Sequence, residues 1–123
     1  MKAELQQKIY DVCPKWFKDL QFGIECDSGW FDVIYDTMVK LKELNFEGPF
    51  SQIKEKYGVL NIYVAGGALD LQWKAIEAAE EKSETICEYC GKEGKLMGDF
   101  WLMTLCDDCK NAKKEESYGK EKS

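Results

Sequence analysis

The sequence contains neither histidine nor arginine, and these two absences restrict its chemistry. All 17 basic residues among the 123 are lysine. Without histidine, the chain lacks the side chain that most often exchanges protons near neutral pH. Without arginine, it lacks the planar guanidinium group that recognises phosphates and guanine edges. Because the formal net charge is also −6, the composition disfavours direct binding to nucleic acid.

Long apolar runs are missing as well. The longest apolar stretches fall far short of the roughly 18 residues of a membrane span, so we expect no contact with a membrane. The first residues, MKAELQQKIYDV, show no apolar core of a signal peptide. We therefore expect a cytoplasmic protein. In that compartment, paired cysteines are more often metal ligands or redox groups than disulfides.

Charge is spread unevenly along the chain. Residues 110–123 carry five lysines and three glutamates, a charge of +2, so the rest of the chain carries −8. The end of this segment has no apolar periodicity. We therefore predict a flexible, charged tail over residues 113–123.

Hydrophobic periodicity predicts an α+β body over residues 1–84. The body is expected to contain a helix at 3–13, a helix at 28–44, hairpin strands at 52–57 and 60–64 around a turn at Tyr57-Gly58, and a helix at 69–82. We expect Asp27 or Ser28 to cap the second helix. The residues predicted to face inward from the third helix are Leu69, Trp73, Ile76 and Ala79. Core packing is also the expected role of the other three tryptophans: Trp16, Trp30 and Trp101.

The segment TICEYCGKEGKLMGDFWLMTLCDDC holds four of the six cysteines. They form two Cys-x-x-Cys pairs with 15 residues between them. Each such turn places two thiolates on one side of a tight loop, and two turns joined by a hairpin complete the sulfur tetrahedron that zinc prefers. We therefore predict a finger over residues 85–112 with a structural Zn²⁺ held by Cys87, Cys90, Cys106 and Cys109. Four protein ligands leave no open position for a reacting water.

The local sequence around the cysteines favours one type of finger. Gly91 follows Cys90 at a position that suits a positive φ. After Cys106, a helix is predicted with Asp107 and Asp108 in its first turn, where the helix dipole favours acidic residues. A turn, a hairpin and a helix form the order of a treble-clef finger, and a zinc ribbon is the alternative. Rubredoxin-like iron and a redox-active dithiol are the other interpretations.

A second candidate site lies in the segment VAGGALD. Gly66 and Gly67 join a strand to a helix, and a glycine-rich helix start is able to hold phosphate. Lys54 and Lys56, on the preceding strand, would supply positive charge. The segment lacks the lysine and hydroxyl residue of a P-loop and the third glycine of a dinucleotide-binding motif. A plain turn is the alternative interpretation.

Acidic residues gather in a third segment, GIECDSGWFDVIYD. Glu25, Asp27 and Asp32 are candidates for acid–base chemistry or Mg²⁺ binding. Helix capping and a solvated helix face are the alternative. Cys13 and Cys26 have no Cys-x-x-Cys partner, so burial as small apolar groups is expected rather than a catalytic thiol.

The chain resembles a group of small phage and prophage proteins with a C-terminal four-cysteine zinc-finger module. Four segments carry the resemblance, in this order: GIECDSGWFDVIYD, QIKEKYGVLNIYVAGG, TICEYCG and TLCDDC. It spans Ile9 to Cys109 and implies a helix–hairpin–helix body, metal ligation by the four cysteines and a bacterial host cytoplasm. It supplies no activity.

These observations favour a protein that acts by binding rather than by catalysis. We expect an inhibitor of a host defence or regulatory protein, and the acidity of the chain favours a partner with a basic surface. A binder that sequesters a nucleotide signal is the alternative, and a metal-dependent hydrolase is the least favoured. The expected contact residues for a partner or ligand are Lys54, Lys56, Gly66, Gly67, Trp30 and Asp27.

Overall fold

The computed structural model of the chain describes residues 1–99 and 101–112. Its elements are α1 (Ala3–Val12), a 3₁₀ turn (Pro14–Trp16), β1 (Ile24–Glu25), a 3₁₀ turn (Ser28–Trp30), α2 (Phe31–Glu43), β2 (Phe50–Lys56), β3 (Val59–Val64), α3 (Asp70–Ser83), β4 (Lys95–Met97) and β5 (Met103–Leu105). Residues 107–112 are helical. This combination of helices and sheets confirms the α+β class. The tail predicted at 113–123 lies outside the described residues.

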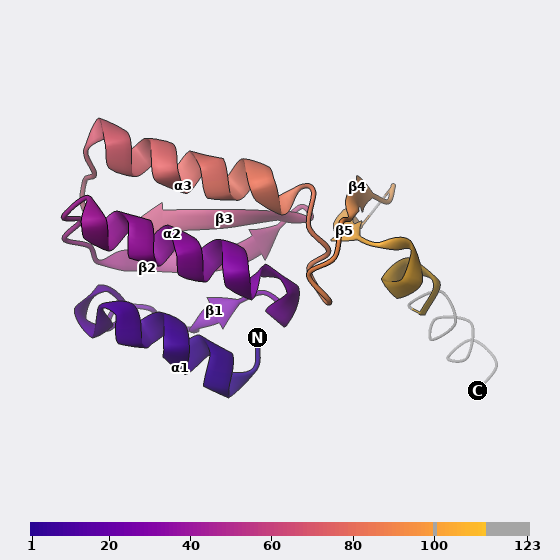
Figure 1. Ribbon diagram of the computed structural model, residues 1–123, viewed down its shortest axis with the longest axis horizontal. Coiled ribbons are helices and arrows are strands. Elements are labelled where there is room, and N and C mark those ends of the chain that lie inside the picture. The colour runs from indigo at the N-terminus through magenta and orange to yellow at the C-terminus, as the bar shows by residue number, and fades with distance from the viewer. Residues whose placement is uncertain (100, 113–123) are drawn as a thin grey trace.

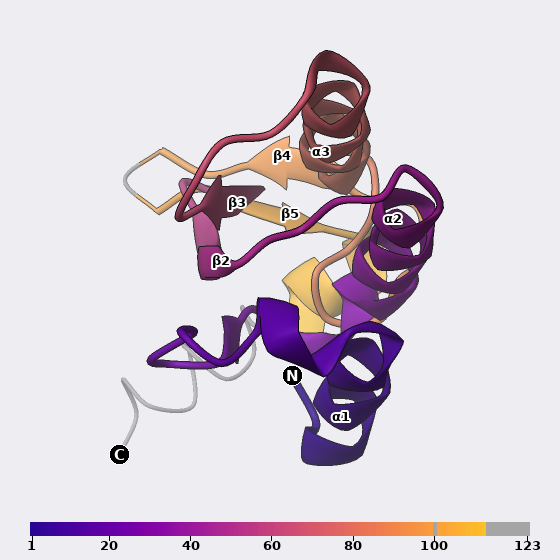
Figure 2. The same cartoon turned by 90° about the vertical axis from the view of Figure 1, so that its left-hand side faces the viewer.

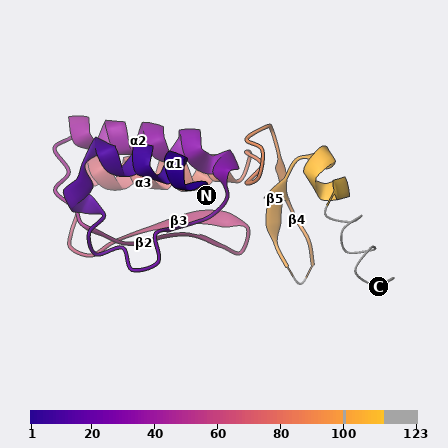
Figure 3. The ribbon, with the colours of Figure 1, turned by 90° about the horizontal axis from the view of Figure 1, so that it is seen from below.

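Helices α1, α2 and α3 lie in one layer over one face of a three-stranded sheet (Figure 1, Figure 3). The strand order is β1-β2-β3, with β1 parallel and β3 antiparallel to β2. Ile24, Ile53 and Ile62 are partners across the three strands and are buried. Because side chains alternate along a strand, the next residues in register lie on the opposite face, which no helix of the described chain covers (Figure 2).

An aromatic cluster fills the end of the core near the α2–β2 connection. Trp16, Phe17, Phe46 and Phe50 are all buried, and their ring centroids lie 5.1–6.4 Å apart. The indole Nε1 of Trp16 donates a hydrogen bond to the carbonyl of Phe46 at 3.1 Å. Because of this hydrogen bond, the indole N–H of Trp16 keeps a partner although its ring is buried.

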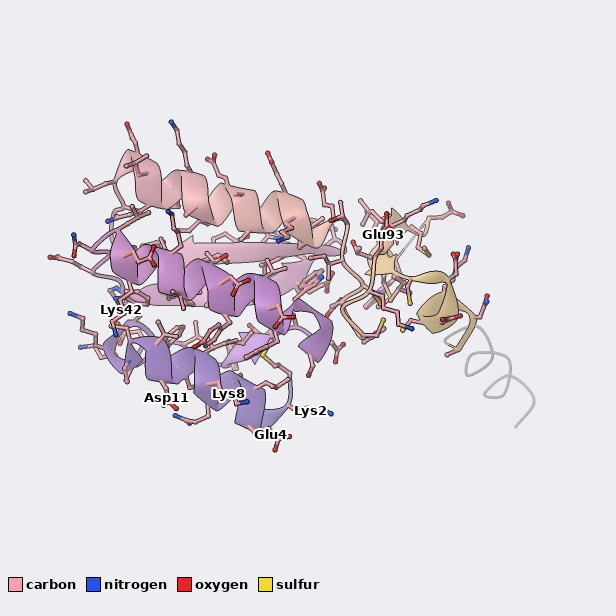
Figure 4. All side chains as sticks on the ribbon, in the orientation of Figure 1. Lys2, Glu4, Lys8, Asp11, Lys42 and Glu93 are labelled. Carbon is pink, nitrogen blue, oxygen red and sulfur yellow. The ribbon has the colours of Figure 1, made fainter. Side chains whose placement is uncertain are left out.

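Charged side chains line the outer face of α1, and a lysine from α2 binds the end of this helix. Lys2, Glu4, Lys8 and Asp11 surround this helix (Figure 4). Lys42 reaches across from α2, and its Nζ donates to the carbonyl of Val12 at 2.9 Å. A lysine at this position satisfies a carbonyl that has no partner within α1 and complements the helix dipole.

The predicted order of elements is confirmed, with differences at caps and helix faces. The hairpin turns at Tyr57-Gly58, as predicted. Neither expected cap makes a side-chain capping bond, because the second helix starts with a 3₁₀ turn. The prediction that Leu69 and Trp73 face inward is wrong, since they are 71% and 37% exposed. Ile76 and Ala79 are buried, as predicted, and Gln72 and Ser83 complete the buried face of α3.

The lack of long apolar runs in the sequence predicts no membrane-spanning segment. None of the helices in the described part of the chain combines the length and the apolar character that a membrane crossing needs.

Candidate metal centre

The four predicted cysteine ligands converge on one point. The Sγ atoms of Cys87, Cys90, Cys106 and Cys109 all lie within 4.8 Å of one another. The Sγ atoms of Cys90 and Cys106 are 3.5 Å apart. Sulfurs bound to zinc at about 2.3 Å in a tetrahedron lie about 3.8 Å apart. The observed spacing therefore fits a four-sulfur metal site, and no disulfide links any of the six cysteines.

Each pair of cysteines is positioned by its own local structure. Cys87 and Cys90 belong to a turn that closes through a 3.0 Å bond from the Gly91 N–H to the Cys87 carbonyl. Gly91 has φ +82°, the conformation that the sequence predicted. Cys106 directly follows β5, and Cys109 lies in the helical residues 107–112. The β4–β5 hairpin therefore brings a turn and a helix start together.

The backbone around the turn prepares Cys87 to act as a thiolate. Burial raises its pKa, but N–H groups of Cys106, Cys90 and Tyr89 directed at the sulfur outweigh this effect, and the pKa falls to about 7. Burial and the neighbouring thiols raise the pKa of Cys109 instead. Closely spaced thiolates repel one another, so a cation among them favours ionisation of the whole group.

The finger is attached to the body through the first cysteine turn. The indole Nε1 of Trp30, which is fully buried, donates to the Ile86 carbonyl at 2.8 Å. The Gly29 N–H donates to the Glu88 carbonyl at 2.7 Å, and the Asp27 N–H donates to the Glu88 carboxylate at 3.1 Å. These three bonds fix the finger against the start of α2.

A second attachment joins the finger to the turn of the β2–β3 hairpin. Thr104, on β5, is fully buried, and its hydroxyl donates to the Gly58 carbonyl at 2.7 Å. An added Cβ on Gly58 would lie 2.9 Å from the backbone of Leu102 and Met103. Only a glycine therefore lets the hairpin turn approach the finger so closely.

The second candidate site is not assembled in the structure. The register places Lys54 opposite Asn61, near the turn of the β2–β3 hairpin, and Lys56 lies beside that turn. Gly66 and Gly67 follow the other end of β3. The length of the hairpin therefore separates the lysines from the glycines that were predicted to share a phosphate with them.

The third candidate site also fails to form a metal-binding group. Among the described residues, the four cysteines make up the only group of three or more cysteine or acidic ligands close enough to hold an ion. Asp27 and Trp30 instead contact the finger. Cys26 is buried, as expected, and burial raises its pKa to about 12. Cys13 is half-buried.

Sequence reasoning missed the residues that join the two parts. Gly29, Glu88 and Thr104 are separated along the chain, and no local pattern indicates that they meet. Trp101, predicted to lie in the core, is 76% exposed.

No protein-family model, curated protein or solved structure matches this chain, so the four-cysteine centre is interpreted from its own geometry.

Proposed function

We propose that this chain is a zinc-stabilised protein that acts by binding a protein partner. The convergence of four thiol sulfurs within 4.8 Å, supplied by two separate segments, carries this proposal. Zinc is favoured because the ligand set is all sulfur and matches the spacing of a zinc tetrahedron. Iron in a rubredoxin-like centre would use the same ligands. The turn, hairpin and helix start follow the order of a treble-clef finger.

A structural role for the metal is favoured over a catalytic one. Four protein sulfurs complete the coordination of zinc and leave no position for water or substrate. In such a site, the metal supplies folding energy rather than Lewis-acid chemistry. Its chemistry here would be to fix the finger in the position where Ile86, Glu88 and Thr104 contact the body.

The partner that we propose is a protein with a basic surface. Outside the last residues, 110–123, the chain carries a charge of −8, which attracts positive surfaces. The resemblance to phage proteins favours a host defence or regulatory protein in the bacterial cytoplasm. Sequestration of a nucleotide signal is less favoured, because Lys54 and Lys56 lie away from Gly66 and Gly67.

Metal analysis of the purified chain tests this proposal. Protein prepared without chelators is expected to contain one zinc per chain, measured by elemental analysis. Cys106→Ser should lose the metal, whereas Cys13→Ser, outside the cluster, should retain it. Iron would give visible thiolate absorption and replace the zinc assignment. Metal-free protein with a folded finger, or full zinc retention in Cys106→Ser, would contradict the proposal.

A further inference from the structure

A cavity lies between the turn of the β2–β3 hairpin and the β4–β5 hairpin, which stand next to each other (Figure 3). It has a volume of about 310 Å³ and is lined by Glu55, Tyr57, Trp101 and Leu102. Tyr57 is 72% exposed and Trp101 is 76% exposed. Two large aromatic side chains therefore face solvent at one opening, beside a carboxylate. Neither ring contributes to the buried core.

The backbone of Tyr57 adopts a conformation that disfavours this residue type. Tyr57 has φ +55° and Gly58 has φ +82°. Tight hairpin turns with two positive φ values prefer asparagine or glycine at the first position, because a bulky side chain is strained there. The chain places a tyrosine at this position, where its ring is exposed. Strain retained by an exposed aromatic residue indicates a role in contact rather than in folding.

The hairpin turn that carries Tyr57 is held in place before any partner arrives. The carboxylate of Glu55 accepts a hydrogen bond from the Gly58 N–H at 2.6 Å, which fixes the turn. The hydroxyl of Thr104 donates to the Gly58 carbonyl at 2.7 Å, which fixes the turn to the finger. Because one wall belongs to the body and the other to the finger, the cavity exists only while the finger is docked. Such preorganisation lowers the entropic cost of binding.

The lining has the chemistry of a site for a cation. Aromatic faces attract cationic groups, and a carboxylate adds a charged hydrogen-bond acceptor. One lysine of the chain already makes such a contact with a lining ring, because Lys56 Nζ lies 5.7 Å from the ring centroid of Tyr57. A guanidinium group suits the cavity best, because it stacks on aromatic rings and binds carboxylates through paired N–H groups.

We propose that this aromatic cavity receives an arginine side chain of the basic protein partner. The inference rests on the proposed function and names the residue that such a partner would insert. The charge of −8 on residues 1–109 complements an arginine-bearing surface. A nucleobase would also stack here, but the carboxylate of Glu55 repels the phosphate of a nucleotide. On the open face of the sheet, Glu25 lies opposite Lys54 and offsets its positive charge. Charge therefore favours the protein partner over single-stranded nucleic acid.

The test uses zinc-loaded protein and a short arginine-rich peptide as the probe, with binding followed by calorimetry. Tyr57→Asn and Trp101→Leu should each weaken binding about tenfold, since each removes one ring and no charge. Tyr57→Asn should also raise the thermal midpoint, because asparagine tolerates the positive φ. Phe22→Leu removes another exposed ring, 68% exposed and outside the cavity lining, and should leave the affinity unchanged.

Three outcomes would overturn the inference. Equal affinity of both cavity variants and the wild type would show attraction by charge alone. Loss of binding in Phe22→Leu to the same extent would show a diffuse aromatic effect. Tighter binding of oligothymidylate than of the peptide would assign the cavity to nucleic acid. The zinc content of every variant is measured in parallel, so zinc-loaded protein that fails to bind the peptide rejects this inference while leaving the metal centre intact.

Discussion

At the scale of single residues, the contact between finger and body depends on Gly29. A Cβ added at this position would lie 2.1 Å from the carbonyl oxygen of Cys87 and 2.5 Å from that of Glu88. Both obstacles are backbone atoms, so no side-chain rotation relieves the overlap. The Gly29 N–H also donates to the Glu88 carbonyl. The absence of a side chain therefore allows the cysteine turn to rest directly on the start of α2.

Alanine at Gly29 should separate the finger from the body. We expect Gly29→Ala to lower the free energy of unfolding by about 3 kcal/mol, because an overlap with rigid backbone forces the two parts to shift. Urea unfolding followed by circular dichroism measures the change. Gly67→Ala is the matched control, because no heavy atom lies within 4 Å of its added Cβ. Similar losses in both variants would show a general effect of replacing glycine.

The importance of Gly29 was not predictable from the sequence, whereas that of the cysteines was. The spacing of two Cys-x-x-Cys pairs is a local pattern with a chemical reason, so it identified all four residues that converge. Gly29 and Thr104 each contact the backbone of residues that lie far away along the chain. Trp101 was misassigned to the core because a tryptophan in a β-type segment looks the same in sequence whether its ring is buried or exposed.

At the scale of elements, α3 protects the outer edge of the sheet. β3 is an edge strand, and an unpaired edge invites pairing with other chains. Here the Leu60 N–H donates to the hydroxyl of Ser83 at 3.0 Å, and the Ile62 N–H donates to the carboxylate of Glu80 at 2.9 Å. Side chains one helical turn apart on α3 therefore satisfy two successive edge N–H groups.

Glu80 should make the stability of the protein depend on pH. Burial raises its pKa above the usual 4.5, the Ile62 N–H opposes this, and the charge of Glu77 adds to it. The folded chain therefore holds the proton more tightly, and stability falls as the pH rises from 4.5 through the raised pKa.

Glu80→Gln should remove this decline, because its amide oxygen still accepts the Ile62 N–H without carrying a charge. Denaturant unfolding measured from acidic to neutral pH should show that the variant is more stable than the wild type at neutral pH. The difference in stability should shrink as the pH is lowered. Glu84→Gln, exposed at the end of α3, is the control. A constant difference at every pH would exclude titration of Glu80 as the cause.

The elements themselves were largely predictable, because helical and strand periodicities are local. The hairpin turn was located correctly by Gly58, and the helix of residues 107–112 by the charge pattern after Cys106. The face that α3 buries was predicted only in part, because Ile76 and Ala79 are buried but Leu69 and Trp73 are not. Leu69 and Trp73 have the more apolar side chains, yet Gln72 is 5% exposed because its amide donates to the Leu44 carbonyl. Tertiary hydrogen bonding outweighed hydrophobicity at this helix start.

At the scale of the whole molecule, the finger and the body are joined at two places. One is the cysteine turn against the 3₁₀ turn before α2, through Trp30 and Ile86. The other is β5 against the β2–β3 hairpin turn, through Thr104 and Gly58. The apolar core of the finger is small, with Cys87, Leu105 and Cys106 as its buried members. A finger with so little buried apolar surface would need a metal bound by its four cysteines to fold.

Metal removal should therefore release the finger while leaving the core of the body folded. A structural zinc site contributes on the order of 10 kcal/mol to the folding of a small finger. The two buried indoles report this difference, since Trp30 Nε1 bonds to the finger at Ile86 and Trp16 Nε1 bonds within the body at Phe46. In ¹H–¹⁵N spectra with a chelator, the Trp30 indole signal should move and exchange faster with solvent. The Trp16 signal should stay in place, and readdition of zinc should restore both. If the Trp30 indole keeps its position without metal, the contacts at Gly29, Trp30 and Thr104 hold the finger by themselves, and the metal is not the source of its attachment.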